Sequence, residues 1–181
     1  MAKLKARIMD EQNVERALKR MAHEITEKNR GVDNLVLIGI KRRGEPLAKR
    51  LAENLKMIEG TEVPVGTIDI RFYRDDLTKE FPSPTLQTSE LGFDVAGKKI
   101  VLVDDVLFSG RTVRAAIEAV FSMGRPDQIQ LAILIDRGHR ELPFRADYVG
   151  KNIPTSYSEH IAVLMPPYDL ETAVDLYETK E

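Results

Sequence analysis

One segment of this chain constrains its fold strongly. It consists of a short apolar run, two adjacent carboxylates, a small polar turn and a helical pattern, in that order. The apolar run covers residues 100–103, the carboxylates are Asp104 and Asp105, and the turn is Ser-Gly-Arg-Thr at 109–112. This order predicts a buried strand, a tight loop and a helix. Such a loop directs unpaired backbone N–H groups and the positive end of the helix at an anion. With carboxylates that can hold vicinal hydroxyls, the segment predicts a site for a phosphorylated ribose.

The alternation of strand and helix continues along the chain. Helical spacing of apolar residues predicts helices over 10–30, 46–55 and 112–123. Strands are predicted at 34–40, 63–73, 100–103 and 130–135, with a last strand at 160–165. The tail at 169–177 fits a helix or a strand. Strands that alternate with helices predict an α/β fold around a mainly parallel sheet, in which ligands bind at the carboxyl ends of the strands.

Length and composition predict one globular domain over residues 1–181. The chain is 43% apolar and 31% charged and has no cysteine, which excludes disulfides and thiolate metal sites and fits a cytoplasmic protein. No apolar stretch approaches the ~18 residues of a membrane span. The basic N-terminus is not followed by an apolar segment, so no signal peptide is expected.

The charge of the chain is unevenly distributed. Residues 1–56 hold 14 Lys and Arg against 8 Asp and Glu, although the whole chain has a net charge of −2. A basic first third indicates a local anion-binding surface. On charge alone, a solvated helix face remains the simpler interpretation.

The loop after the acidic pair differs from other phosphate-binding loops. No Lys follows Gly110, so the segment is not a P-loop, and the glycine spacing of a dinucleotide site is absent. An aspartyl phosphotransferase would carry its second carboxylate at the position of Val106. Plain charge at the edge of a sheet is the remaining alternative, and the Ser-Gly-x-Thr sequence beside the acids argues against it.

The segment 99–116 resembles the phosphoribosyl-diphosphate motif of the type I phosphoribosyltransferases. Further segments resemble the bacterial branch of that family that combines an RNA-binding attenuator of pyrimidine genes with a uracil phosphoribosyltransferase. These segments are 40–44, 73–77, 136–143 and 145–156. The resemblance implies a type I phosphoribosyltransferase fold: a mainly parallel sheet flanked by helices, a small hood at about 136–161 and a flexible loop at about 71–97.

The resemblance also implies a reaction, in which uracil and phosphoribosyl diphosphate give UMP and diphosphate. Asp104 and Asp105 would hold the ribose hydroxyls. The cradle for the 5′-phosphate would comprise Val106, Leu107, Phe108, Ser109, Gly110, Arg111 and Thr112. The loop for the diphosphate would comprise Lys41, Arg42, Arg43 and Gly44. Mg²⁺ is expected on the diphosphate, held largely by substrate oxygens and not by a dedicated protein site.

By the same resemblance, a flexible loop closes over the site and the base binds after the strand at 130–135. The flexible loop would contribute Arg71, Tyr73, Arg74 and Lys79. The uracil and nucleotide site would include Asp136, Arg137 and Ile161. The resemblance assigns no general base, and Asp136 is only a hypothesis for that role.

The resemblance further implies an RNA-binding face for a hairpin of pyrimidine mRNA leaders. Its residues would be Lys19, Arg20, His23, Lys28, Arg140, Arg145 and Lys151. Basic side chains supply contacts to RNA phosphates. UMP or UTP in the pocket would favour RNA binding, and the family leads us to expect a homodimer or a higher homo-oligomer and no membrane partner.

Two alternatives remain at this stage. A hypoxanthine/guanine phosphoribosyltransferase would share the phosphate loop, but the segment 139–156 argues against it. A purely regulatory RNA-binding protein with a vestigial nucleotide pocket is the other alternative, and the intact acidic pair and loop argue against that.

Overall fold

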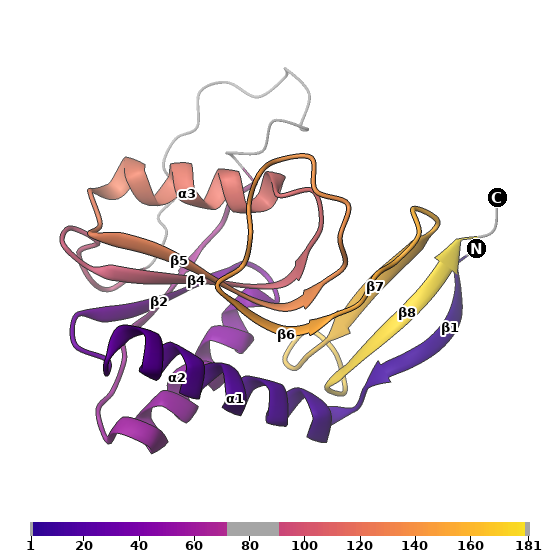
Figure 1. Ribbon diagram of the computed structural model, residues 1–181, viewed down its shortest axis with the longest axis horizontal. Helices are drawn as coiled ribbons and strands as arrows, with labels where there is room; N and C mark the ends of the chain where they lie inside the picture. The colour runs from indigo at the N-terminus through magenta and orange to yellow at the C-terminus, as the bar shows by residue number, and fades with distance from the viewer. Residues whose placement is uncertain (1, 72–90, 180–181) are drawn as a thin grey trace.

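Five parallel strands form the central sheet of the protein, in the order β3, β2, β4, β5, β6 (Figure 1). The computed structural model describes residues 2–71 and 91–179. The strands are β2 (Leu35–Ile40), β3 (Val65–Ile68), β4 (Lys99–Leu107), β5 (Gln128–Asp136) and β6 (Tyr148–Asn152). This arrangement confirms the predicted parallel α/β fold and places β4 at the centre of the sheet.

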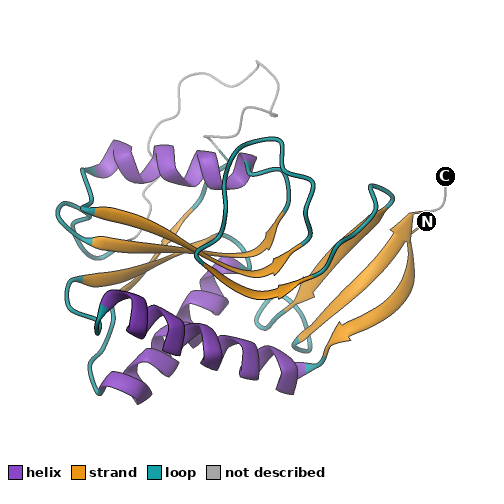
Figure 2. Cartoon of the chain, in the orientation of Figure 1, coloured by secondary structure: helices purple, strands orange, loops and turns teal. Residues whose placement is uncertain are grey.

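Helices cover both faces of this sheet (Figures 1 and 2). The helices α1 (Glu11–Asn29) and α2 (Gly44–Glu59) pack on one face, against side chains such as Leu37 and Val101. The helix α3 (Arg111–Met123) packs on the other face, against Ile38 and Leu102. Because both faces are buried, the central strands are apolar at consecutive positions and do not alternate.

The first helix forms where the sequence predicts it. The side chain of Asp10 accepts a hydrogen bond from the backbone N–H of Asn13, which satisfies one of the free donors at the helix start. The predicted apolar stripe, including Val14, Leu18 and Ile25, is buried against the sheet. The basic residues of α1 therefore lie on the faces that the sheet leaves exposed.

A second, antiparallel sheet joins the two ends of the chain. It consists of β1 (Ala2–Met9), β7 (Glu159–Leu164) and β8 (Ala173–Thr179) in the order β1, β8, β7, so that the N and C termini lie close together (Figure 1). The prediction that the strand at 160–165 is the last one was wrong, because the undecided tail forms β8. β7 also contacts β4, which joins the small sheet to the large one.

Several boundaries differ from the sequence-based expectations. Within the described residues 63–71, the strand predicted at 63–73 is limited to β3, whereas β4 continues through the acidic pair. The segment 136–158, for which the sequence predicts no strand, contains β6 at the edge of the large sheet, whereas the predicted strand at 160–165 is confirmed as β7 in the small sheet. The hood at about 136–161 stays a prediction, and most of the predicted flexible loop lies outside the described residues.

No helix in the described ranges combines the length and the hydropathy that a bilayer crossing needs.

Candidate active site

The loop between β4 and α3 surrounds a cavity of about 290 Å³. The cavity is lined by residues 106–113 and by Glu141, and thus by every residue predicted to cradle the 5′-phosphate. The side chain of Ser109 accepts a hydrogen bond from the backbone N–H of Arg111, which shapes the turn into the helix. The first turn of α3 lines this cavity and contains no acidic residue, so its positive end is available to an anion.

Glycine is required at the N-cap of α3. Gly110 has a φ of 94°, a conformation that residues with a Cβ rarely adopt. A Cβ there would also lie 3.1 Å from the ring of Phe144 and 3.3 Å from the Cβ of Leu142. The phosphate loop is therefore packed tightly against the segment that follows β5.

The two carboxylates at the end of β4 lie in different environments. Asp104 is buried, with 7% of its surface exposed, and accepts a hydrogen bond from the backbone N–H of Asp105 at 2.9 Å. Burial, and then the nearby charge of Asp105, raise the pKa of Asp104 well above its usual range. Asp105 is only half-buried. The pair therefore places one buried and one half-exposed carboxyl group where a ligand with two hydroxyls could meet them.

The raised pKa of Asp104 predicts a pH-dependent effect of Asp104→Asn on stability. The folded state holds the proton more tightly than the unfolded chain, whose pKa is about 3.9. The contribution of protonated Asp104 to the free energy of unfolding is therefore fully present below about pH 4. It is lost as the pH rises through the pKa of Asp104 in the folded state. The amide that replaces the carboxyl group does not titrate, so the melting temperature of Asp104→Asn should exceed that of the wild type at pH 8. The difference should be about 2–4 °C for each kcal/mol of unfolding free energy that the wild type loses on ionisation of Asp104.

Thermal melts from pH 4 to pH 9 measure this effect. The difference between the two proteins should rise with pH. A difference that is constant over the range would mean that Asp104 does not titrate with folding. Asp33→Asn, an exposed carboxylate far from the site along the chain, serves as the control.

The predicted diphosphate loop lies beside the acidic pair. Gly44 packs so closely on β4 that a Cβ would lie 2.3 Å from the carbonyl oxygen of Val103, directly before Asp104. Lys41 and Arg42 are exposed and are joined by a cis peptide bond. Arg43 instead donates two hydrogen bonds to the carboxylate of Asp169, each at 3.1 Å. The structure thus places exposed Lys41 and Arg42 beside the acidic pair, with the guanidinium of Arg42 5.7 Å from the centroid of the Tyr168 ring, and turns Arg43 toward the loop before β8.

The base end of the site differs from the expectation at Arg137. Asp136 ends β5 and is half-buried, and Ile161 on β7 is also half-buried. Arg137 is buried and donates to the carbonyl oxygens of Ser156 and Glu159 and to Thr155. Its guanidinium also lies over the ring of Phe108, 4.2 Å from the centroid. Arg137 therefore joins the small sheet to the phosphate loop, and most of its donors are already used.

Of the residues predicted to act from the flexible loop, Arg71 lies in the described ranges. Arg71 donates hydrogen bonds to both carboxylate oxygens of Asp69, and this contact holds the pKa of Asp69 below its usual range. Tyr73, Arg74 and Lys79 lie outside the described residues.

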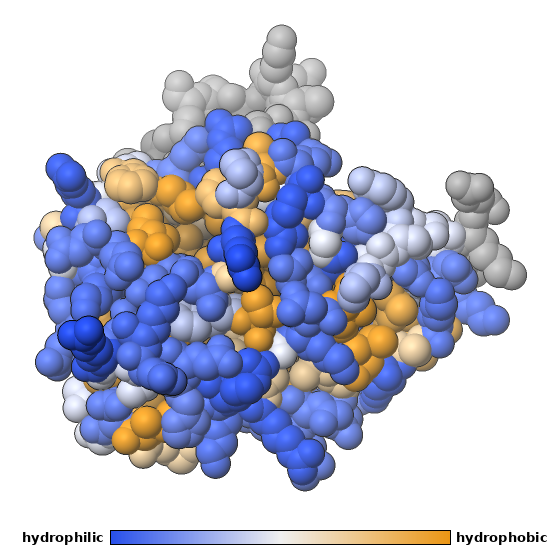
Figure 3. All heavy atoms as spheres, viewed as in Figure 1, coloured by the Kyte–Doolittle hydropathy of each residue, from blue (hydrophilic) through white to orange (hydrophobic). Residues whose placement is uncertain are grey.

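The predicted RNA-binding residues of α1 lie beside β6. Arg20 donates to the carbonyl oxygens of Val149 and Gly150, and Lys28 pairs with Asp147 at 2.5 Å. Figure 3 shows hydrophilic side chains over much of this face. The exposed residues of the predicted set are Lys19, Arg20, His23, Lys28, Arg145 and Lys151. Arg140 differs from them, because it is half-buried and all its contacts are internal.

Sequence reasoning missed the residues that position the site from a distance. They are Thr155, Glu159, Glu141 and Asp169, which contact Arg137, Arg111 or Arg43 across 18 to 126 positions of sequence. A periodic sequence pattern cannot predict hydrogen bonds between residues that are so far apart in the chain. The density of basic residues after β5 was the one available signal.

The comparisons with known proteins agree with this geometry. The family described as phosphoribosyl transferase domain matches residues 6–168. The chain is 57% identical over 181 residues, all of both chains, to the bifunctional protein PyrR of Pelotomaculum thermopropionicum. It is 60% identical over 167 residues, 92% of both chains, to the bifunctional protein PyrR of Caldicellulosiruptor saccharolyticus. Among solved structures, the hypoxanthine phosphoribosyltransferase of Trypanosoma cruzi superposes with a TM-score of 0.74 at 19% identity, covering 98% of both chains, which shows the shared fold.

Proposed function

The chain belongs to the PyrR family of phosphoribosyltransferases, and from this premise we propose that it both makes UMP and regulates pyrimidine genes through RNA. The enzymatic activity converts uracil and phosphoribosyl diphosphate to UMP and diphosphate. The regulatory activity is the nucleotide-dependent binding of a hairpin in pyrimidine mRNA leaders, in the cytoplasm. The observation that carries the proposal is the phosphate cavity at the end of β4, with the acidic pair and the Gly44 loop beside it.

The chemistry that this site supports is positioning and electrostatic stabilisation. The bond between ribose and diphosphate breaks as the base attacks, so positive charge grows on the ribose and negative charge on the leaving group. The backbone and hydroxyl donors at 109–112 hold the 5′-phosphate, and Asp104 and Asp105 hold the ribose hydroxyls. Because these groups are held in place before the reaction, they lower the barrier without rearrangement.

The departing diphosphate requires cations. Lys41 and Arg42 are exposed at the loop that packs on β4, and they would neutralise part of its charge. The part of the chain that the structure describes holds no group of three or more acidic or histidine side chains that could form a metal site. We propose that Mg²⁺ arrives with the diphosphate and is held largely by substrate oxygens and water.

The choice of base is tested by a direct assay. With phosphoribosyl diphosphate and Mg²⁺, uracil should give UMP and hypoxanthine should give no nucleotide. Turnover of hypoxanthine would favour a purine enzyme, as the fold neighbours alone would suggest. If neither base were converted to a nucleotide but the protein still bound the hairpin, the result would favour a purely regulatory protein with a vestigial nucleotide pocket.

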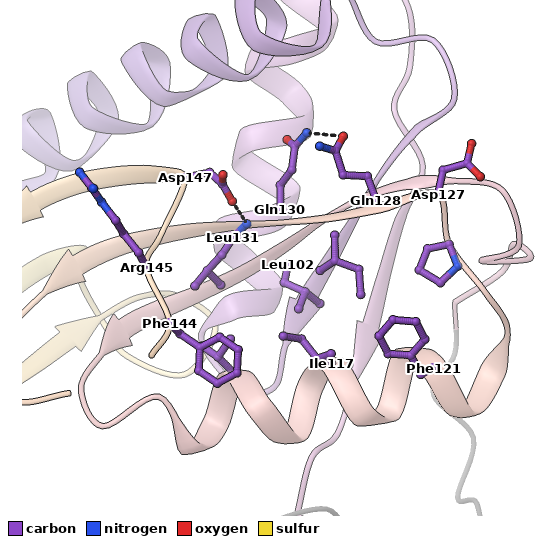
Figure 4. A pocket seen from close by; sticks show the side chains of 13 residues that line it. Leu102, Ile117, Phe121, Asp127, Gln128, Gln130, Leu131, Phe144, Arg145 and Asp147 are labelled. Atoms are coloured by element: carbon purple, nitrogen blue, oxygen red, sulfur yellow. Dashed lines mark hydrogen bonds between the residues drawn. The ribbon is translucent and has the colours of Figure 1, made fainter. Parts of the chain in front are cut away.

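We further propose that a second copy of the chain docks on an apolar groove beside α3 (Figure 4). The groove has a volume of about 350 Å³ and is lined by Ile117, Phe121 and Leu131, among others. Phe121 is 56% exposed. A two-fold axis through the groove would pack the Phe121 rings of two copies against each other and bury their apolar surface. The homodimer expected from the family would thus form on this face.

The groove predicts that Phe121→Asp weakens self-association. Burying a carboxylate in an apolar interface should raise the dimer Kd by at least about a hundredfold. Sedimentation velocity at micromolar protein should then shift from the dimer toward the 20.5 kDa monomer. Met57→Asp, at a residue on α2 that is 74% exposed, is the matched control and should leave the dimer intact. Equal behaviour of the two variants would exclude this face.

A further inference from the structure

The segment between β5 and β6 lies directly against the phosphate loop. The carbonyl oxygen of Ser109 accepts hydrogen bonds from the backbone N–H groups of Glu141 and Leu142, at 2.9 and 3.0 Å. Arg111 at the start of α3 pairs with Glu141. Phe144 and Leu142 also pack against Gly110. A change in the phosphate loop is therefore transmitted to this segment by backbone contacts.

Arg140 lies at the centre of this contact. Its Nη1 donates to the carbonyl oxygen of Phe108 at 2.9 Å, in the phosphate loop. Its Nη2 donates to Asp136 at 2.5 Å, at the base end of the site. Its Nε donates to the carbonyl oxygen of Phe144 at 2.9 Å, the residue directly before Arg145. One planar guanidinium, whose donors have a rigid geometry, thus connects three segments.

Arg145 is the opposite case. Its side chain is exposed, and within the described residues no hydrogen bond or ion pair engages it. The side chain of Arg140 is only 23% exposed. Arg145 can therefore contact RNA at once, whereas Arg140 would first have to break three internal hydrogen bonds, each of which would leave an acceptor without its partner.

We propose that Arg140 is a positioning residue that holds the phosphate loop against the segment carrying Arg145, and that it thereby couples nucleotide binding to RNA binding. This inference rests on the proposed function and assigns a different role to a residue that the family resemblance places on the RNA face. It requires no direct contact between Arg140 and either ligand.

The physical basis of the coupling is the order that a bound nucleotide imposes on the loop. A 5′-phosphate in the cavity binds the backbone of 109–112 and restricts it. Through Arg140 and the carbonyl of Ser109, the restricted loop also restricts the segment up to Phe144. When the nucleotide is bound, the segment that carries Arg145 is already ordered, so RNA binding loses less conformational entropy. The affinity of the protein for RNA therefore rises when the nucleotide is present.

The experiment compares Arg140→Gln and Arg140→Lys with Arg145→Gln. We would measure kcat and the KM values for phosphoribosyl diphosphate and uracil. We would also measure the Kd for a synthetic pyrimidine-leader hairpin with and without UMP. In Arg140→Gln, the KM for phosphoribosyl diphosphate should rise about tenfold, since a charged donor to the loop is lost. The KM for uracil should change less.

The RNA measurements separate the two arginines. In Arg140→Gln, the ratio of the Kd without UMP to the Kd with UMP should fall toward one, and the Kd without UMP should stay close to that of the wild type. In Arg145→Gln, both Kd values should rise by about tenfold with the ratio and turnover unchanged. Arg140→Lys keeps the charge but not the planar geometry, so it should lie between wild type and Arg140→Gln.

The opposite pattern would overturn the proposal. If Arg140→Gln weakened the hairpin equally with and without UMP and left the KM for phosphoribosyl diphosphate unchanged, Arg140 would be a direct RNA contact. Should Arg140→Gln not fold, the same comparison with Arg140→Lys decides. Failure of the proposed function would appear in the wild type instead, as missing UMP formation or missing hairpin binding.

Discussion

Asp104→Asn combined with Asp105→Asn should lower kcat/KM for UMP formation by at least about a thousandfold, because both side chains that would hold the ribose hydroxyls lose a carboxyl oxygen. The amides keep the size of the side chains and some hydrogen bonds to the ribose. They cannot supply the negative charge that stabilises the positive ribose of the transition state. The loss should therefore fall mainly on kcat. Steady-state kinetics with uracil and phosphoribosyl diphosphate measures both constants.

A structural collapse would also remove activity, so the variant needs a second readout. Hairpin binding uses a different surface and should stay within about threefold of the wild type without UMP, as expected for independent sites. Asp33→Asn, with its exposed carboxylate, should leave both activities unchanged. A double variant that turns over at the wild-type rate would refute the role of the acidic pair.

The meeting of the acidic pair and the loop at the end of β4 was predictable because these parts are contiguous in sequence. A buried strand, the acids and the loop occupy one segment, and their order determines which groups meet at the end of β4. The helix α1 was predictable for a similar reason, since Asp10 and the apolar stripe are local signals. Both kinds of signal need no knowledge of distant residues.

The small sheet was not predicted because its strands are far apart in sequence. β1 pairs with β8, so Ala2 lies opposite Thr179. The first strand has six exposed residues in succession and no core face to mark it. The edge strand β6 is only five residues long. Short or exposed strands of this kind form through pairing with neighbours, which the local sequence does not report.

The roles of individual cations were the hardest to predict. The local sequence does not distinguish these arginines, because each is a basic residue that follows a strand. This applies to Arg43, Arg137 and Arg140 as well as to Arg42 and Arg145. The structure separates them by their partners, since the first three donate to Asp169, to the small sheet and to the phosphate loop. Sequence position therefore indicated which segments meet at the ends of the strands, but not which of their side chains are already engaged by partners within the protein.

The free cations beside β6 give the second large prediction. Arg145→Glu combined with Lys151→Glu should weaken hairpin binding by at least about a hundredfold at physiological salt, because each reversal removes a phosphate contact and adds repulsion. Both side chains are exposed, and in the described part of the chain neither has a hydrogen bond or an ion pair to lose. Arg20 is less suitable, since it donates to the backbone of β6.

The salt dependence of binding distinguishes this surface from a general effect of charge. The slope of log Kd against log salt should fall by about two in the double variant, one for each lost phosphate contact. Lys3→Glu with Lys56→Glu changes the net charge by the same amount at exposed sites on β1 and α2, and should retain most of the affinity. UMP formation should be unchanged in both double variants. If the two double variants lost hairpin binding equally, the cations beside β6 would act only through the overall charge of the protein, and the RNA site would have to lie elsewhere.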